Sequence, residues 1–140
     1  MNATVNFDGT FVAAGSVFGY QTDDGVPVVW TSKTNGATWH FAWAPGGVVG
    51  SSGSDQLLAV TGNVILLVSF GTPGSVLWRS TDPDSWTRVV LPEWMDENFV
   101  TSLTTGLEGE VSAVVQNKGF PGPQKSTWVT ADGGLTWTEQ

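Results

Sequence analysis

The chain has 140 residues, which suits one domain or one part of a larger assembly. Five Lys and Arg residues against thirteen Asp and Glu residues give a formal net charge of −8, so we expect neither nucleic acid nor an anionic membrane as a partner. Without cysteine, disulfides and thiolate metal sites are excluded. No phosphate-binding loop, signal peptide or membrane-length apolar run is found, and we expect no cofactor.

The first strands are predicted at residues 3–7 and 10–14. Both runs are short, apolar and rich in β-branched residues, which favours strands over helices. The Asp8-Gly9 pair between them supplies the positive φ angles that a two-residue hairpin needs. A third strand is predicted to end at Ser32 and a fourth to start at Trp39.

The same order of elements follows twice more along the chain. In the second copy, strands are predicted at residues 56–60 and 64–70, then up to Ser80 and from Trp86. In the third copy they are predicted at 99–103 and 110–115, then up to Thr130 and from Trp137, after one possible helical turn within residues 92–98.

Two tryptophans mark each copy, with spacings of 47 to 51 residues: Trp30, Trp78 and Trp128, and then Trp39, Trp86 and Trp137. Four antiparallel strands at such a period are typical of a β-propeller blade. We therefore predict an all-β chain of three four-stranded blades, with blade 1 at about 1–44, blade 2 at about 53–92 and blade 3 at about 97–140.

The turn before each fourth strand carries the most specific motif. The third copy, Thr-Ala-Asp-Gly-Gly-Leu-Thr-Trp from Thr130 to Trp137, resembles the Asp-box (BNR) repeat Ser/Thr-x-Asp-x-Gly-x-Thr-Trp of sialidase-like propellers. The first copy has Thr34 in place of Asp, and the second is one residue shorter and lacks the Gly. The box positions are Ser32, Gly36, Trp39, Ser80, Asp82, Trp86, Thr130, Asp132, Gly134 and Trp137.

We expect these boxes to be structural, because such turn side chains bond their own loop and the Trp packs against it. The resemblance implies an extracytoplasmic or secreted protein, with the boxes on the face opposite any active site. It does not extend to sialidase activity, which uses three arginines and a tyrosine. Only Arg79 and Arg88 are present, both near the box end, and Tyr20 is the single Tyr.

The loops at the other end of the blades are acidic and aromatic. Aromatic rings stack on sugars and carboxylates bind their hydroxyls, so Tyr20, Trp43, Trp94 and Glu97 are the candidates for a carbohydrate site. A glycosidase needs two suitably spaced carboxylates, for which the candidates are Asp23, Asp24, Glu93 and Asp96. The same residues also fit a solvated acidic rim with tryptophans packed between blades. Isolated acidic pairs are usually solvated, and we predict no metal site.

Three blades do not close a ring, since propellers have about four to eight. We expect an apolar face at each end of the array, covered by a second copy in a six-bladed homodimer. The favoured function is a non-enzymatic scaffold or binding module, for which a glycan is the candidate ligand, and a fragment or engineered half-propeller belongs to the same class. The alternative is a non-sialidase glycoside hydrolase.

Overall fold

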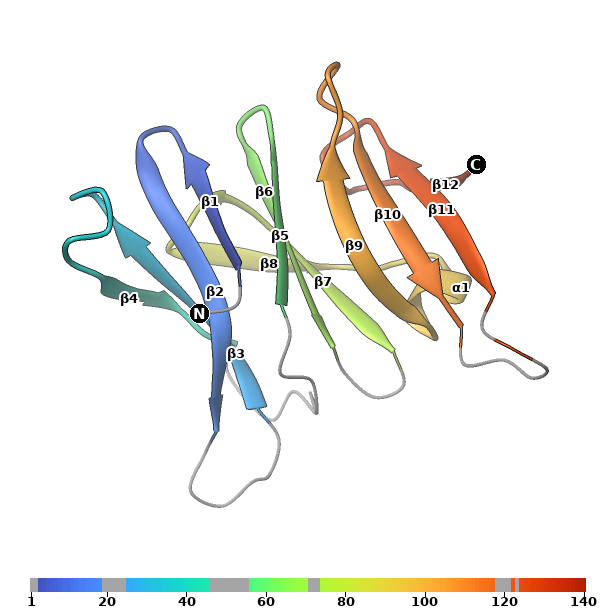
Figure 1. Ribbon diagram of the computed structural model, residues 1–140, viewed down its shortest axis with the longest axis horizontal. Coiled ribbons are helices and arrows are strands. Elements are labelled where there is room, and N and C mark those ends of the chain that lie inside the picture. Colours follow the sequence, from blue (N-terminus) through green and yellow to red (C-terminus); the bar gives the residue numbers. More distant parts are fainter. Residues whose placement is uncertain (1–2, 19–24, 46–55, 71–73, 118–121, 123) are drawn as a thin grey trace.

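The computed structural model describes residues 3–18, 25–45, 56–70, 74–117, 122 and 124–140. These residues form three four-stranded antiparallel sheets, and in each sheet the strands are ordered as they occur in the chain (Figure 1). The predicted all-β architecture of three four-stranded units is confirmed, and we refer to the sheets as blades 1, 2 and 3.

The strand bounds follow the predicted order. Blade 1 contains β1 (Ala3–Phe7), β2 (Thr10–Phe18), β3 (Gly25–Ser32) and β4 (His40–Trp43). Blade 2 contains β5 (Gln56–Thr61), β6 (Val64–Phe70), β7 (Ser75–Asp82) and β8 (Ser85–Val89). The one-turn helix α1 (Glu93–Asp96) leads to blade 3, which contains β9 (Phe99–Thr105), β10 (Val111–Gln116), β11 (Lys125–Thr130) and β12 (Thr138–Glu139).

Left-handed backbone at the tight turns explains where the hairpins form. Asp8 and Gly9 have φ angles of 48° and 80°, as the Asp-Gly pair predicts, and Gly62 has a φ of 56° between β5 and β6. Gly adopts such angles without a steric clash of a Cβ atom, and Asp and Asn adopt them more readily than most other residues. Each turn therefore sets the register of the first two strands of its blade.

The innermost strands β1, β5 and β9 lie next to one another, so the blades fan out from a common line (Figure 1). Two hydrogen bonds join the inner edges of blades 2 and 3. The Thr105 hydroxyl of β9 donates to the carbonyl of Val60 at 2.8 Å, and the Thr61 hydroxyl of β5 donates to the carbonyl of Gly109 in the β9–β10 turn. These bonds hold blades 2 and 3 in register along their inner edges.

Each blade has a leading face, toward the preceding blade, and a trailing face, toward the next one. The trailing face of blade 1 and the leading face of blade 2 share an apolar core made of Val12, Ala14, Val29, Ile65, Leu67, Val76, Trp78 and Trp86. The core between blades 2 and 3 includes Val64, Leu66, Val68, Leu77, Val111, Ala113, Val115 and Trp137. Full burial of one such side chain contributes ~1.5–3 kcal/mol, so these two cores dominate the stability of the array.

Among the described residues, no blade packs against the leading face of blade 1. A hollow of about 430 Å³ on this face is lined by Val17, Val26, Val28, Trp30, Phe41 and Ala44. Val17 is 50% exposed and Phe41 is 65% exposed. This face is apolar and open, as expected.

The trailing face of blade 3 is different. In β10, Val111, Ala113 and Val115 are buried against blade 2, so alternation turns Ser112 and Val114 outward. The cross-strand partners of these two residues in β11 are Val129 and Thr127, while Gln116 pairs with Lys125. The expectation of an apolar face at both ends is therefore wrong for blade 3, whose outer face is largely polar.

Candidate functional site

The three turns before the last strand of each blade, residues 32–39, 80–86 and 130–137, are called box loops 1, 2 and 3 here. In box loop 3 the Asp132 carboxylate accepts hydrogen bonds from the Thr130 hydroxyl at 2.8 Å and from the backbone N–H groups of Leu135 and Thr136 at 3.0 and 2.9 Å. It also accepts a bond from the Thr136 hydroxyl at 2.5 Å. These bonds, above all the one from the Thr136 hydroxyl, lower the pKa of Asp132 from 3.8 to about 2.

Box loop 1 keeps this arrangement without an aspartate. Thr34 stands at the Asp position, and its hydroxyl accepts a bond from the Thr38 N–H at 2.9 Å. The Ser32 hydroxyl accepts a bond from the Gly36 N–H at 2.9 Å, and the Trp39 ring N–H donates to the Gly36 carbonyl at 3.1 Å. A hydroxyl thus replaces the carboxylate in closing the loop.

Box loop 2 is the shortened copy. Asp82 accepts a bond from the Asp84 N–H at 3.0 Å, and the Trp86 ring N–H donates to the Pro83 carbonyl at 2.7 Å. The ring of Trp86 is 8% exposed, as is that of Trp137 in box loop 3, because each packs against the preceding blade. Trp39 is only half-buried, since no blade of the described residues packs against the leading face of blade 1.

The opposite end of the blades carries the residues expected to bind a sugar. The helix α1 brings Glu93, Trp94, Asp96 and Glu97 together, with Glu93 and Glu97 exposed. The Asn98 amide donates to the Trp94 carbonyl at 2.6 Å, which closes the helical turn. Trp94 itself is half-buried and packs against the core between blades 2 and 3. Tyr20, Asp23 and Asp24 lie outside the described residues.

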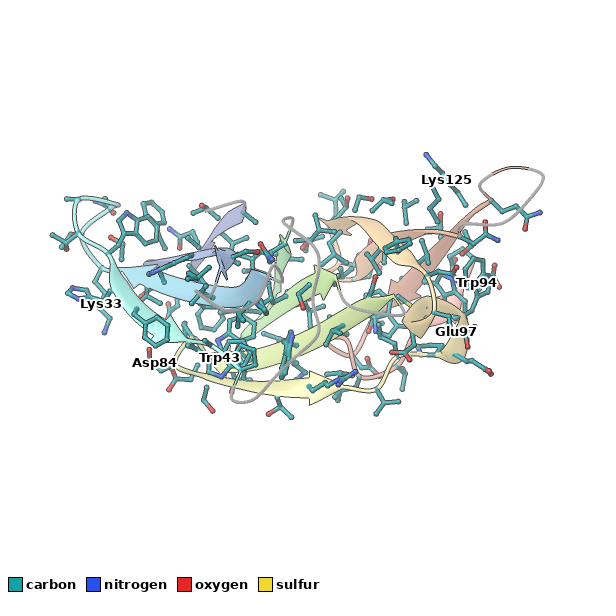
Figure 2. The ribbon with its side chains drawn as sticks, turned by 90° about the horizontal axis from the view of Figure 1, so that it is seen from below. Lys33, Trp43, Asp84, Trp94, Glu97 and Lys125 are labelled. Atoms are coloured by element: carbon teal, nitrogen blue, oxygen red, sulfur yellow. The ribbon has the colours of Figure 1, made fainter. Side chains whose placement is uncertain are left out.

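Trp43 is not part of that group. Its ring meets the ring of Trp78 edge-on at 4.9 Å between centroids and lies 5.8 Å from that of Trp86. It therefore packs between blades 1 and 2, and Figure 2 shows it far along the molecule from Trp94 and Glu97. Of the predicted carbohydrate residues that the structure describes, only Trp94 and Glu97 come together.

A polar cleft between blades 1 and 2, at the box end, was missed by reasoning from the sequence. It has a volume of about 170 Å³ and is lined by Phe7, Asp8, Thr10, Thr31, Lys33, Asp82, Pro83 and Asp84. An adjoining hollow of about 370 Å³ is lined by Thr31, Lys33, Thr34, Thr38, His40, Phe41 and Asp84. The shortened box loop 2 was the one available signal, because a shorter loop leaves space beside the preceding blade.

Within the described ranges, no group of three or more His, Cys, Asp or Glu side chains is placed to hold a metal ion. The described part of the chain also has no helix that is long and apolar enough to cross a membrane.

No protein-family model matches the sequence. No curated protein matches it either. Solved structures do match: a Dyadobacter fermentans protein of unknown function is 17% identical with a TM-score of 0.75, over 99% of this chain and 52% of that one. The α-L-arabinofuranosidase Arb93A of Fusarium graminearum, as an E242A mutant with an iminosugar inhibitor, is 15% identical with a TM-score of 0.65, over 94% and 44%.

The chain has the β-propeller fold. It spans about half the length of the Dyadobacter and Fusarium chains. A fucose lectin from Kordia zhangzhouensis, solved in complex with methyl-fucoside, is 12% identical with a TM-score of 0.56. In that case the match covers 98% of this propeller chain and 95% of the lectin chain.

Proposed function

We propose that the chain is a non-enzymatic, carbohydrate-binding propeller module of Asp-box blades, and that two copies close one six-bladed ring. The observation that carries the proposal is the open leading face of blade 1. Its hollow is lined by apolar side chains, Phe41 and Val17 among them, at 65% and 50% exposure. Exposed apolar surface of this kind marks an interaction site in a soluble protein.

Equivalent positions in the blades indicate what covers this face. Trp30 occupies in blade 1 the position of Trp78 in blade 2. Each pairs with the fourth residue of the preceding strand, Ala13 of β2 or Leu67 of β6. Trp78 is buried against the trailing face of blade 1, which consists of small side chains such as Val12, Ala14 and Val29.

The trailing face of blade 3 also carries small side chains, Ser112, Val114 and Thr127, together with Gln116 and Lys125. Such a face in a second copy leaves room for Trp30 and Phe41 of the first copy, as the trailing face of blade 1 does for Trp78. Repeating the contact at both ends gives a closed ring with two-fold symmetry. The polar content of this face reduces the apolar contribution to each contact.

Carbohydrate binding is supported by what the similar propellers bind. The Kordia lectin was solved with methyl-fucoside, and the Fusarium arabinofuranosidase was also solved with arabinobiose. The lectin match extends over nearly its whole chain, so a sugar-binding chain of this extent exists. In the present chain, Trp94 and Glu97 supply an aromatic ring and a carboxylate on α1. A secreted or surface location belongs to the same proposal.

Light scattering coupled to size exclusion tests the ring. We expect a particle of twice the 14.8 kDa chain mass; a monomer at all concentrations would rule out self-closure.

A glycan array with a glycosidase screen tests the ligand. We expect binding without turnover, lost in Trp94→Ala and retained in Val90→Ala, an exposed position on blade 2. Turnover that Glu93→Gln abolishes would instead favour the hydrolase alternative.

A further inference from the structure

The two interfaces between blades differ at the box end, and the difference concerns one side chain. Between blades 2 and 3, Arg79 projects from the trailing face of blade 2, and its Nε–H donates to the Gly133 carbonyl at 2.9 Å. The guanidinium is thus held by the backbone of box loop 3. This contact fills the space between the two blades.

Box loop 3 fits closely against blade 2 on either side of that arginine. A Cβ added to Gly133 would lie 3.2 Å from the Val64 side chain, and a Cβ added to Gly134 would lie 2.7 Å from that of Leu66. Both glycines have positive φ angles, 71° and 88°, which allow the loop backbone this close approach. Box loop 3 therefore packs directly against blade 2 at this level.

Between blades 1 and 2 the equivalent arginine is missing. Thr31 immediately precedes Ser32 in the first box, as Arg79 immediately precedes Ser80 in the second, so Thr31 takes the place of Arg79. The shortened box loop 2 presents Pro83 and Asp84 in place of the two glycines. The result is the open cleft of about 170 Å³, far above the ~10–15 Å³ that one water needs.

The charges around the cleft are complementary to the guanidinium group that Arg79 places between blades 2 and 3. Its lining includes the carboxylates of Asp8, Asp82 and Asp84, against the single ammonium of Lys33. Lys33 and Asp84 lie at the same end of the molecule, on neighbouring box loops (Figure 2). Carboxylates bind guanidinium groups through paired, charge-assisted hydrogen bonds, and these are stronger than bonds between neutral groups.

We propose that the cleft between blades 1 and 2 binds a guanidinium group, such as an arginine side chain presented by a partner peptide. The ligand takes the position that Arg79 occupies between blades 2 and 3. Asp84 and Asp82 accept its hydrogen bonds, and Lys33 opposes it by charge repulsion. The site is independent of ring closure and of the carbohydrate proposal, because all of its lining residues belong to one chain and none lies on α1.

Amide chemical-shift titration of the full chain with methylguanidinium chloride, at fixed ionic strength and well below denaturing concentrations, tests the proposal. We expect saturable shifts centred on Lys33, Asp82 and Asp84. Urea, the neutral planar analogue, should give none, and methylammonium should bind more weakly because it cannot pair with a carboxylate through two parallel bonds. A methyl glycoside that shifts these amides while methylguanidinium does not would overturn the proposal.

Three variants are expected to change the affinity for methylguanidinium in different ways. Asp84→Asn should weaken binding by about tenfold, the value of one lost charge-assisted hydrogen bond. Lys33→Ala should tighten it by about threefold, since a repelling exposed charge is removed. Thr31→Arg should abolish binding by filling the cleft from within, as Arg79 does.

Glu108→Gln removes an exposed carboxylate from the β9–β10 turn and serves as the control, with binding unchanged. Equal weakening by Glu108→Gln and Asp84→Asn would show general attraction to an acidic protein and overturn the proposal. If Thr31→Arg fails to fold, the opposite signs expected of Asp84→Asn and Lys33→Ala still decide the question.

Discussion

Single side chains close the box loops, and the three copies do so with different chemistry. Asp132 accepts hydrogen bonds from two hydroxyls and two backbone N–H groups, whereas Thr34 serves box loop 1 with one hydroxyl. Asp82 accepts a single backbone bond in the shortened loop 2. The motif therefore tolerates loss of its aspartate, because what the loop needs is an acceptor for its backbone N–H groups.

The low pKa of Asp132, about 2, predicts how its contribution to stability depends on pH. A lowered folded-state pKa means stabilisation that is present above the ordinary value of 3.8 and is lost as pH falls toward 2. Asp132→Ala should cost about 1 kcal/mol of unfolding free energy at pH 7, after allowance for solvent screening. The cost should shrink between pH 4 and 2. Urea titrations over this range measure it.

Asp82→Ala is the control for that series, because Asp82 stands at the same position of box loop 2 but its side chain accepts one bond rather than four. We expect a smaller loss of unfolding free energy than in Asp132→Ala. Equal losses in the two variants at every pH would contradict the role assigned to the Asp132 network.

At the scale of elements, the sequence predicted most of the strands because turns and periodicity are local signals. Asp8-Gly9 predicted the first hairpin, and Ser32 and Thr130 end their strands where expected. The cleft could not be predicted in this way. It depends on Thr31 facing a shortened loop of another blade, and that contact is set by packing between sheets rather than by either segment alone.

Box loop 3 packs closely against blade 2, so we predict that an added methyl group destabilises the fold more in this loop than at an open turn. Gly134→Ala would place a Cβ 2.7 Å from the Leu66 side chain at a φ of 88°, so steric overlap adds to backbone strain. Gly9→Ala has a similar φ of 80° but nothing within 4 Å of the added atom. We expect a loss of ~1–2 kcal/mol for Gly9→Ala and at least ~1 kcal/mol more for Gly134→Ala.

Chemical unfolding of both variants, monitored by tryptophan fluorescence, measures the difference. The emission should respond strongly in Gly134→Ala, because Trp137 in the same loop is buried between the blades. A cost for Gly9→Ala as large as for Gly134→Ala would mean that the φ angle alone matters and that the close approach to Leu66 does not.

At the scale of the whole molecule, the two end faces are unequal. The leading face of blade 1 is apolar and hollowed, while the trailing face of blade 3 mixes Ser112, Thr127 and Gln116 with two valines. The apolar stretch Val111–Val115 suggested two apolar ends, but strand alternation turns three of its four apolar side chains, Val111, Ala113 and Val115, inward. In the proposed assembly, the exposed apolar surface of blade 1 therefore supplies most of the driving force, and the second copy presents a face that accepts Trp30 and Phe41.

The charge variant Phe41→Glu tests that dependence on blade 1. Phe41 is 65% exposed at the open face, so the proposed assembly buries it and a carboxylate there would lose its hydration without a partner. We expect the variant to be monomeric, with an unfolding midpoint that no longer rises with protein concentration. Leu107→Glu, at a fully exposed turn of blade 3, should leave mass and midpoint unchanged. Sedimentation equilibrium measures the mass of each variant, and thermal unfolding at several protein concentrations measures the midpoint. A Phe41→Glu variant that still forms the dimer would place the contact elsewhere.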